Sequence, residues 1–380
     1  MFPNDFPQAF ELFPLAPLPQ TDAFLAGKLT ALDAPGGGEI QLFGTVDGLS
    51  SLGVRARLWR PWEESIADAK CLHLFGSLPE HLPLVDAARR ADVPVLLSTI
   101  AWFDLQSYLR EPVGVLRRGR AAAGFLARAA LPKLPSWRRR LYDAVDMLLP
   151  NSNAEATQLR RYFGVPPEKL HVVPNAADPR FADGQPEPFL RLLERHWPDG
   201  ADDDTRRQVA AGRFVLYVGR IEPRKNQLGL LKALRGTDVP IVLLGDAVPG
   251  HDRYWKACCK AADAHTCFLP RLQHDDPLLR SAYAACGCLA LTGWYETPGL
   301  VALEAAMTGT PLVLPRGGSA SEYFDRDALY VSPGDLRAIR QAVLQALDRP
   351  RNAVMAERVR HCFTWQTAAA ATLEAYQKVW

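Results

Sequence analysis

A segment in the second half of the chain carries cations at a position suited to binding phosphate. The apolar run FVLYV at residues 214–218 predicts a buried strand, and Gly219, Arg220 and Lys225 follow before the next helix. In an open α/β sheet, ligands bind beyond the carboxyl ends of the strands. Two cations there, together with the amides of a helix N-terminus, can hold a diphosphate. Arg224 is an alternative to Lys225, and surface ion pairs with carboxylates are the structural alternative for all of them.

A second segment, WYETPGLVALEAAMTG at residues 294–309, carries two glutamates eight positions apart. Glu296 is predicted in a loop after the strand CLALTG, and Glu304 in the second turn of the following helix. Ionised carboxylates only accept hydrogen bonds, so they suit the paired hydroxyls of a sugar. The structural alternative is that one glutamate stabilises the dipole of the helix start and the other lies on a solvated helix face. Glu304 has apolar neighbours, however, and a buried carboxylate needs a partner or a ligand. The helix begins at Pro298 and presents the amides of Gly299, Leu300 and Val301.

Apolar runs that alternate with amphipathic segments predict an α/β protein with parallel sheets. After a proline-rich start that is expected to be irregular, a glycine-rich loop at 36–39 leads into a helix at 40–49. Strands are predicted at 54–59, 71–75 and 93–99, with a helix at 84–93. A second alternation begins at 213 and ends with a strand at 328–331. The polar, acidic stretch 183–212 between them predicts a linker.

Composition excludes several classes of protein. The chain has 380 residues, 48% of them hydrophobic and 23% charged, which indicates a folded protein of about two domains. Its net charge of +2, from 44 basic and 42 acidic residues, gives no electrostatic footprint for nucleic acid. The seven cysteines include no Cys-x-x-Cys pair and are expected to be free thiols. No secretory signal and no run of roughly 18 apolar residues is present, so we expect a cytoplasmic protein.

One stretch, residues 110–140, is strongly basic. Glu111 is its single glutamate beside nine cations, and apolar residues are interleaved among them. Such a segment predicts peripheral contact with an anionic membrane surface. A solvated helix face, or an arginine-rich groove for an anionic substrate, are the alternatives. The cations are Arg110, Arg117, Arg118, Arg120, Arg128, Lys133, Arg138, Arg139 and Arg140.

Six segments, taken in order, resemble the family 4 glycosyltransferases, which are retaining enzymes of the GT-B fold. The ETPGLVALE segment is similar to the family's Glu-x7-Glu motif, and GRIEPRKNQ to its Gly-Arg…Lys element. Together the segments cover most of the chain: GGGE (36–39), SNAEATQLRRYFGVPPEKLHVVPNAAD (152–178), GRIEPRKNQ (219–227), ETPGLVALE (296–304), GGSASEYF (317–324) and FTWQTAAAATLEAY (363–376).

The resemblance implies two Rossmann-like, doubly wound domains that face a central cleft. We accordingly predict an acceptor-binding domain at 1–182, a linker at 183–212, a nucleotide-sugar donor domain at 213–362, and a C-terminal helix at 363–380 that packs back on the first domain. The predicted function is transfer of a hexose from a UDP- or GDP-linked sugar to a glycan or lipid-linked acceptor, in assembly of bacterial surface polysaccharide or lipopolysaccharide. No metal or cofactor is expected.

The resemblance also implies roles for individual residues. Arg220 and Lys225 would hold the donor diphosphate and Glu304 the ribose hydroxyls. Glu296 would contact the transferred sugar beside the amides of residues 298–301, and with Arg220 and Lys225 it forms the predicted catalytic set. Gly37 and Gly38 would let the opposite domain's backbone approach the phosphates, and Arg271 would border the base.

Some positions depart from the family pattern. Many relatives carry a His near the position of Ala101, and this chain has none there. His73 follows a different strand and is interpreted as structural. Ala176 and Asn226 stand where glycines are usual. These departures concern the first-domain catalytic group and leave the donor site unaffected.

Three other functions compete with sugar transfer. A sugar phosphorylase or starch-synthase-like enzyme could use the same fold, and the former would carry pyridoxal phosphate on a lysine. An NAD-dependent oxidoreductase would need Gly-x-Gly-x-x-Gly after a first strand, which neither half offers. A degenerate nucleotide-sensing or scaffold protein would have no need of the intact cations and glutamates.

Overall fold

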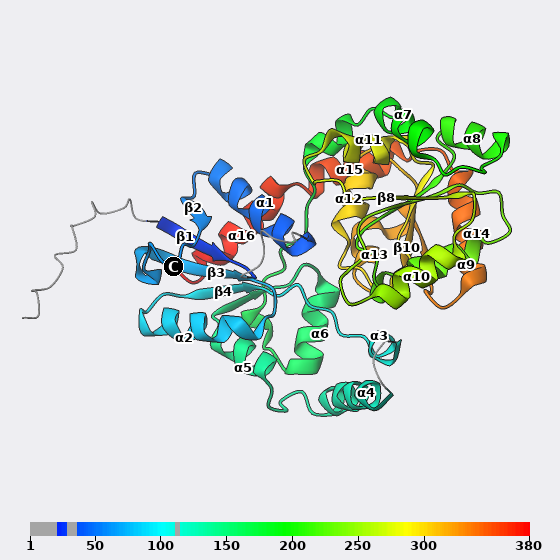
Figure 1. The fold of residues 1–380 in the computed structure, drawn as a ribbon. Coiled ribbons are helices and arrows are strands. Elements are labelled where there is room, and N and C mark those ends of the chain that lie inside the picture. Colours follow the sequence, from blue (N-terminus) through cyan, green and yellow to red (C-terminus); the bar gives the residue numbers. More distant parts are fainter. Residues whose placement is uncertain (1–20, 29–35, 111–114) are drawn as a thin grey trace, which may run out of the picture.

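The chain folds into two α/β lobes, each built on a parallel sheet (Figure 1). The structure is a computed structural model that describes residues 21–28, 36–110 and 115–380. In the described residues the first sheet has the strand order β2-β1-β3-β4-β5 and the second has the order β11-β10-β9-β6-β7-β8. Both orders are those of doubly wound folds, as the alternating strands and helices of the sequence predict.

The strands of the first sheet are β1 (Thr21–Ala26), β2 (Ala56–Leu58), β3 (Ala69–Phe75), β4 (Val95–Ser98) and β5 (Met147–Leu149). Those of the second are β6 (Val215–Val218), β7 (Ile241–Leu244), β8 (Thr266–Leu269), β9 (Cys288–Ala290), β10 (Leu312–Pro315) and β11 (Ala328–Val331).

The first lobe's helices are α1 (Gly37–Ser51), α2 (Leu82–Arg90), α3 (Leu105–Arg110), α4 (Val115–Ala130), α5 (Trp137–Ala144) and α6 (Asn153–Phe163). The second lobe has α7 (Glu187–His196), α8 (Asp203–Ala210), α9 (Gln227–Leu234), α10 (Asp252–Ala261), α11 (Pro277–Ala285), α12 (Leu300–Ala306), α13 (Ala320–Phe324), α14 (Leu336–Leu347) and α15 (Ala353–Cys362). The last helix, α16 (Trp365–Gln377), returns to the first lobe (Figure 1).

Strand β1 lies in a stretch that the sequence analysis expected to be irregular. Its six residues pair with β2 on one side and with β3 on the other, so that Ala23 is opposite both Ala56 and Cys71. A short run with a polar start, directly after a proline-rich stretch, gives too weak a periodicity to mark a strand. Its place inside the sheet, between β2 and β3, makes it a core element all the same.

The polar stretch 183–212 is not the linker that its composition predicted. It forms α7 and α8, whose apolar residues Phe189, Leu193 and Val209 belong to the hydrophobic core of the second lobe. Both helices are strongly amphipathic, and the many charged residues of their outer faces dominate the composition. The chain crosses between lobes earlier, near Ala177.

Two crossings of the chain lie side by side between the lobes. The amide of Ala177 donates to the carbonyl of Phe363 at 2.9 Å, and Ala177 and Thr364 form a parallel bridge. Side chains from α13 add further interlobe hydrogen bonds. The Glu322 carboxylate accepts from the amides of Asn153 and Ala154, at 2.8 and 2.6 Å, and so caps the N-terminus of α6.

Tyr323, also on α13, makes the second interlobe contact. Its hydroxyl accepts from the amide of Asn175 at 2.8 Å and donates to the carbonyl of Asn151 at 2.5 Å. Because the ring is buried, both bonds are shielded from water. The two lobes are therefore held in a defined arrangement near the crossings.

Helix α16 packs on α1 through two glycines. A Cβ at Gly44 would lie 2.3 Å from the Trp365 ring, and one at Gly48 would lie 2.5 Å from the Trp365 carbonyl oxygen. The side-chain face of α16 completes a core cluster of the first lobe with Ala368, Ala369 and Tyr376. The small residues on α1 thus permit the return of the chain.

We expect Gly48→Ala to destabilise the protein by about 1–3 kcal/mol, because the new methyl group would overlap a backbone carbonyl that cannot rotate away. Urea unfolding would measure this as a lower midpoint. Gly124→Ala is the matched control, because Gly124 is also helical but has nothing within 4 Å of its Cβ position. A Gly48→Ala protein as stable as Gly124→Ala would contradict the proposed contact.

Candidate functional site

The predicted cation and carboxylate meet at the carboxyl edge of the second sheet. Strands β6 and β9 are neighbours there, and the connections from them run in opposite directions, which is the position at which doubly wound sheets bind ligands. Lys225 ends a single 3-10 turn after β6, and Glu296 lies in the loop after β9. Lys225 Nζ is 2.6 Å from Glu296 Oε1, and the two side chains are 14% and 5% exposed. The structure therefore brings two residues 71 positions apart into a buried ion pair.

The loop that carries Glu296 is fixed by backbone contacts. Its amide donates to the Gly317 carbonyl at 3.2 Å, and its carbonyl accepts from the Ser319 amide at 2.9 Å. A Cβ at Gly318 would lie 1.8 Å from the Glu296 carbonyl oxygen, so only glycine fits there. The carboxylate itself packs against Gly299, where a Cβ would lie 3.2 Å from Oε2. These contacts hold the carboxylate in place.

Burial lowers the pKa of Lys225, because the ammonium is removed from water. The negative charge and hydrogen bond of Glu296 act in the opposite direction, and the positive charge of Arg224 acts with burial. The charged state of Lys225 therefore depends on its contact with Glu296. An anion bound beside the ammonium would favour that state further.

Arg220 and Arg224 lie on either side of Glu222. Arg220 Nη2 is 3.7 Å from Glu222 Oε1 and its side chain is 58% exposed, whereas Arg224 Nη2 is 3.1 Å from the same oxygen. The Arg224 guanidinium also lies over the Tyr295 ring, 5.2 Å from its centroid. Burial alone would lower the pKa of Arg224. The charges of nearby groups, Glu296 foremost, outweigh burial, so the pKa lies above its usual value. The buried pair with Glu296 thus uses Lys225, and the alternative, Arg224, is turned toward Tyr295.

Glu304 has its own partners on neighbouring elements. The Tyr283 hydroxyl donates to Glu304 Oε2 at 2.6 Å, and His274 Nε2 is 3.1 Å from Oε1. Glu304 is buried on α12, as its apolar neighbours predicted. Burial and the Glu304 charge raise the pKa of Tyr283 well above its usual range. The sequence analysis missed both partners, because α11 and the loop after β8 carry no motif that marks them.

The start of α12 faces the start of α1 across the cleft. Pro298 follows a cis peptide bond, Gly299 has a φ of 90°, and Leu300 and Val301 begin the helix. A Cβ at Gly37 would lie 3.6 Å from Leu300 Cδ1. Gly37 therefore lies against the opposite lobe, and its expected approach to the donor phosphates stays a prediction.

The two predicted glycines of the GGGE segment differ in their surroundings. They are the first residues of α1 and not part of a loop, with Gly36 as the N-cap residue. A Cβ at Gly38 would meet Ile100 of its own lobe at 3.6 Å. Of the two, Gly37 is the one placed against the second lobe.

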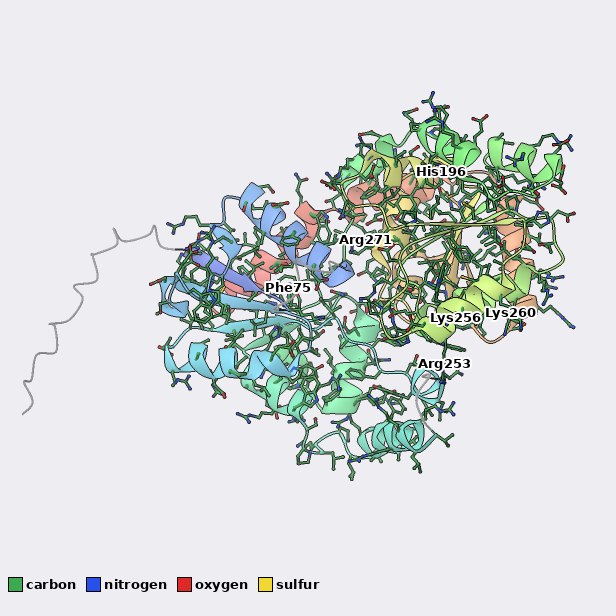
Figure 2. The ribbon with its side chains drawn as sticks, viewed as in Figure 1. Phe75, His196, Arg253, Lys256, Lys260 and Arg271 are labelled. Atoms are coloured by element: carbon green, nitrogen blue, oxygen red, sulfur yellow. The ribbon has the colours of Figure 1, made fainter. Side chains whose placement is uncertain are left out.

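Arg271 lies after β8, at the side of the second lobe that faces the first (Figure 2). Its amide donates to Asp246 Oδ1 at 3.1 Å, and Nη2 donates to Gln273 Oε1 at 3.0 Å. These contacts hold the loop after β8 against the loop after β7. The structure thus places Arg271 at the cleft, where a role beside a base remains a prediction.

In the first lobe, a buried glutamate occupies the neighbourhood of Ala101. The Glu155 carboxylate accepts from the Ala101 amide at 2.7 Å, the Asn151 amide at 2.7 Å and the Thr99 hydroxyl at 2.5 Å. Burial raises the pKa of Glu155 despite these bonds. The sequence analysis did not single out Glu155, which holds the loop after β4 in the cleft.

His73 has a structural environment, as interpreted from the sequence. Its ring nitrogens lie 2.9 Å from the Tyr376 hydroxyl and 3.0 Å from Ser98 Oγ. Burial lowers the pKa of His73 to about 3, so the ring is neutral at physiological pH. The ring connects β3, β4 and α16 and lies within the core.

Comparison with known proteins identifies the family. A family model described as glycosyl transferases group 1 matches residues 203–361, and one described as glycosyltransferase family 4 matches residues 33–181. A glycogen synthase of Mycobacterium tuberculosis is 30% identical over 337 residues, which cover 84% of this chain and 69% of that protein. The chain belongs to glycosyltransferase family 4. This membership leaves the oxidoreductase hypothesis without support.

Other family 4 relatives match over shorter stretches. The O-antigen chain mannosyltransferase B of Escherichia coli is 26% identical over 62% of this chain, and the D-rhamnosyltransferase WbpZ of Pseudomonas aeruginosa is 30% identical over 56%. The matches span 61% and 53% of the length of those two relatives. Substrates named for them therefore bear on this chain only as proposals.

Solved structures show that the family 4 chain has the GT-B fold. HepE of Anabaena, in complex with UDP and glucose, has a TM-score of 0.67 at 17% identity and covers 94% of this chain and 100% of its own. Sucrose-phosphate synthase of Thermosynechococcus elongatus has a TM-score of 0.70 at 16% identity and covers 94% and 99%. The predicted two-lobed architecture is confirmed.

We expect Glu296→Gln to lower the pKa of Lys225 further, because the substitution removes the negative charge that favours the ammonium. The pH dependence of Lys225 acetylation, followed by peptide mass spectrometry, would measure the shift as faster labelling at lower pH. Lys232, exposed on α9, is the internal control and should label alike in both proteins. An unchanged Lys225 profile would show that the pair is not formed in solution.

Proposed function

We propose that this family 4 chain is a retaining glycosyltransferase that moves a hexose from a nucleoside diphosphate sugar to a glycan or lipid-linked acceptor, in assembly of a bacterial surface polysaccharide. The observation that carries the proposal is the buried Lys225–Glu296 pair where β6 and β9 end. Arg220 follows the same strand β6 and is exposed beside Glu222. The names of the mannosyltransferase and rhamnosyltransferase relatives support the reaction class and the O-antigen context. The UDP and glucose named for HepE support the kind of donor.

The chemistry that the site would perform is stabilisation of a leaving diphosphate. As the bond between the anomeric carbon and the phosphate oxygen breaks, negative charge grows on the diphosphate. Lys225 and Arg220 would hold that charge, so a metal ion is not needed in the proposed mechanism. Removing one preorganised contact of this kind costs about 2.7–4 kcal/mol, or roughly 100–1000-fold in rate.

The glutamates would divide the remaining work. Glu296, held by Lys225 and Gly299, would accept from hydroxyls of the transferred sugar. Glu304 would accept from the ribose, with Tyr283 and His274 fixing its orientation. We propose retention through same-face attack, in which the leaving phosphate assists removal of the acceptor proton. The anomeric configuration of the product by NMR decides this, and inversion excludes it.

Helix α4 supports a peripheral membrane contact through the basic segment 110–140, of which the structure describes 115–140 in full. Leu116 and Val115 are largely exposed at its start, next to the exposed cations Arg117 and Arg120. Exposed apolar and basic side chains on one helix suit the surface of an anionic bilayer. In the described part of the chain, no helix is long and apolar enough to cross a bilayer.

UDP or GDP should raise the melting temperature of the wild type, and Arg220→Ala should lose most of that shift. A ligand at 100 times its dissociation constant adds about 2.7 kcal/mol of stability. A thermal-shift panel of UDP, GDP, ADP, CMP and NAD measures this, with Arg207→Ala, a substitution of an exposed residue of α8, as the control.

Glu304→Gln should weaken nucleotide binding, whereas Glu296→Ala should keep nucleotide binding and depress turnover. Normal binding and turnover in both glutamate variants would place the site elsewhere.

Sedimentation with vesicles tests the membrane contact. Binding to vesicles of phosphatidylcholine should rise with added phosphatidylglycerol and should fall more than tenfold in Arg117→Glu/Arg120→Glu, because each cation adds about 1 kcal/mol. The matched control is Arg206→Glu/Arg207→Glu, which makes the same charge change on exposed residues of α8. Binding that ignores the anionic lipid content contradicts the proposal.

A further inference from the structure

A large cavity adjoins the candidate donor site. Its volume is about 930 Å³, and both lobes line it. The first lobe contributes residues of the loop after β4, of α3 and of α5, and the second contributes the loop after β6, the start of α10 and the loop after β9. Arg224 and Tyr295 line the cavity, and Lys225 and Glu296 are the next residues along the chain. A molecule in this cavity would therefore lie beside the buried ion pair.

Aromatic side chains from both lobes meet in this cavity. Trp102 of the first lobe and Tyr295 of the second are stacked, with ring centroids 6.5 Å apart and an interplanar angle of 29°. Phe103 and Tyr254 also line the wall. Aromatic faces with polar rims bind ligands that are apolar on one side and hydrogen-bonding on the other, and a pyranose ring is such a ligand.

The wall of the cavity also includes a cation that makes no ion pair with any described residue. Arg138 of α5 lines it, and its Nε is buried and has no hydrogen-bond partner. The guanidinium lies over the Trp137 ring at 4.3 Å and forms no ion pair with the described residues. A buried guanidinium nitrogen without a partner carries an unmet desolvation cost, which an anion would relieve.

Arg253 adds a second cation from the opposite lobe. It lies on α10, near α3 (Figure 2), and it lines the same cavity without a partner among the described residues.

Two of the three acidic residues in the wall are already engaged. Asp104 accepts from the amide and hydroxyl of Ser107, and Glu222 pairs with Arg224. Asp252, at the start of α10, is exposed. The formal charges of the wall balance, with three arginines and three acidic residues. The attraction for an anion therefore comes from the unpartnered Arg138 nitrogen and not from net charge.

We propose that this cavity is the acceptor site and that it selects a saccharide carrying an anionic group, a phosphate or a carboxylate. The inference rests on the proposed glycosyl transfer and adds the acceptor's chemical class. Trp102 and Tyr295 pack on the sugar ring, and Arg138, with Arg253 opposite, binds the anion. The anion is carried by a soluble sugar or by a lipid diphosphate to which the sugar is attached.

Titration of the full chain with its stabilising nucleotide bound tests the proposal. The probes are glucose 6-phosphate, mannose 6-phosphate, glucuronate and farnesyl diphosphate, each compared with glucose or mannose. We expect at least one anionic probe to bind about tenfold or more tightly than the neutral sugars, as a charge-assisted hydrogen bond allows. Binding of the sugar phosphates or glucuronate indicates a soluble acceptor, and binding of farnesyl diphosphate alone indicates a lipid-linked one.

Two variants separate recognition of the anion from recognition of the ring. Arg138→Gln should remove the preference for the anionic probe, whereas Trp102→Ala should weaken charged and neutral probes alike. Arg140→Gln is the matched control, since Arg140 lies on the same helix but is exposed and pairs with Asp86. Equal binding of charged and neutral probes, or equal loss in Arg138→Gln and Arg140→Gln, overturns the proposal. The nucleotide shift is read separately, so its absence marks failure of the proposed function instead.

Discussion

The burial of one ion pair constrains the functional half of this protein. Lys225 and Glu296 are both removed from water, and an unpaired charge in that position would cost several kcal/mol. The two charges stay paired because hydrogen bonds connect the loops after β6 and β9 next to them. The Trp294 amide donates to the Arg224 carbonyl at 3.0 Å, and the Asn226 side chain donates to the Thr292 carbonyl at 2.9 Å. Lys225, Glu296 and the second-lobe part of the cavity wall thus belong to one edge of the second sheet.

That edge is useful only if the first lobe is held opposite it. The two chain crossings, the Glu322 cap on α6 and the buried Tyr323 hydroxyl define how the lobes meet. The meeting places Gly37 against Leu300 and Trp102 against Tyr295. Elements with no part in the chemistry therefore decide which residues share the cleft.

Local patterns predicted much of the second lobe. Its strands and most of its helices follow from strong apolar alternation, and Lys225 and Glu296 were predicted at strand ends, where the structure has them. The position of β1 and the packing of α7 and α8 were not predictable in this way. A short strand after prolines, and helices whose outer faces are densely charged, give misleading local signals. Tyr283, His274 and Glu155 were missed for another reason. Their significance lies in contacts with residues distant in sequence, which no spacing along one chain reveals.

The return of α16 to the first lobe has a consequence for the order of events during synthesis. Ala368, Ala369 and Tyr376 belong to the same core cluster as β1 and β3, and the Tyr376 hydroxyl is a hydrogen-bond partner of buried His73. A nascent chain in which only the first lobe has been made still exposes the α1 face that carries Gly44 and Gly48, and its His73 ring has only the Ser98 partner. The second lobe draws its core from residues 177–359, all of which precede α16 in the chain. The lobe made first is thus the lobe finished last, and it waits for a helix encoded about 300 codons downstream of β3.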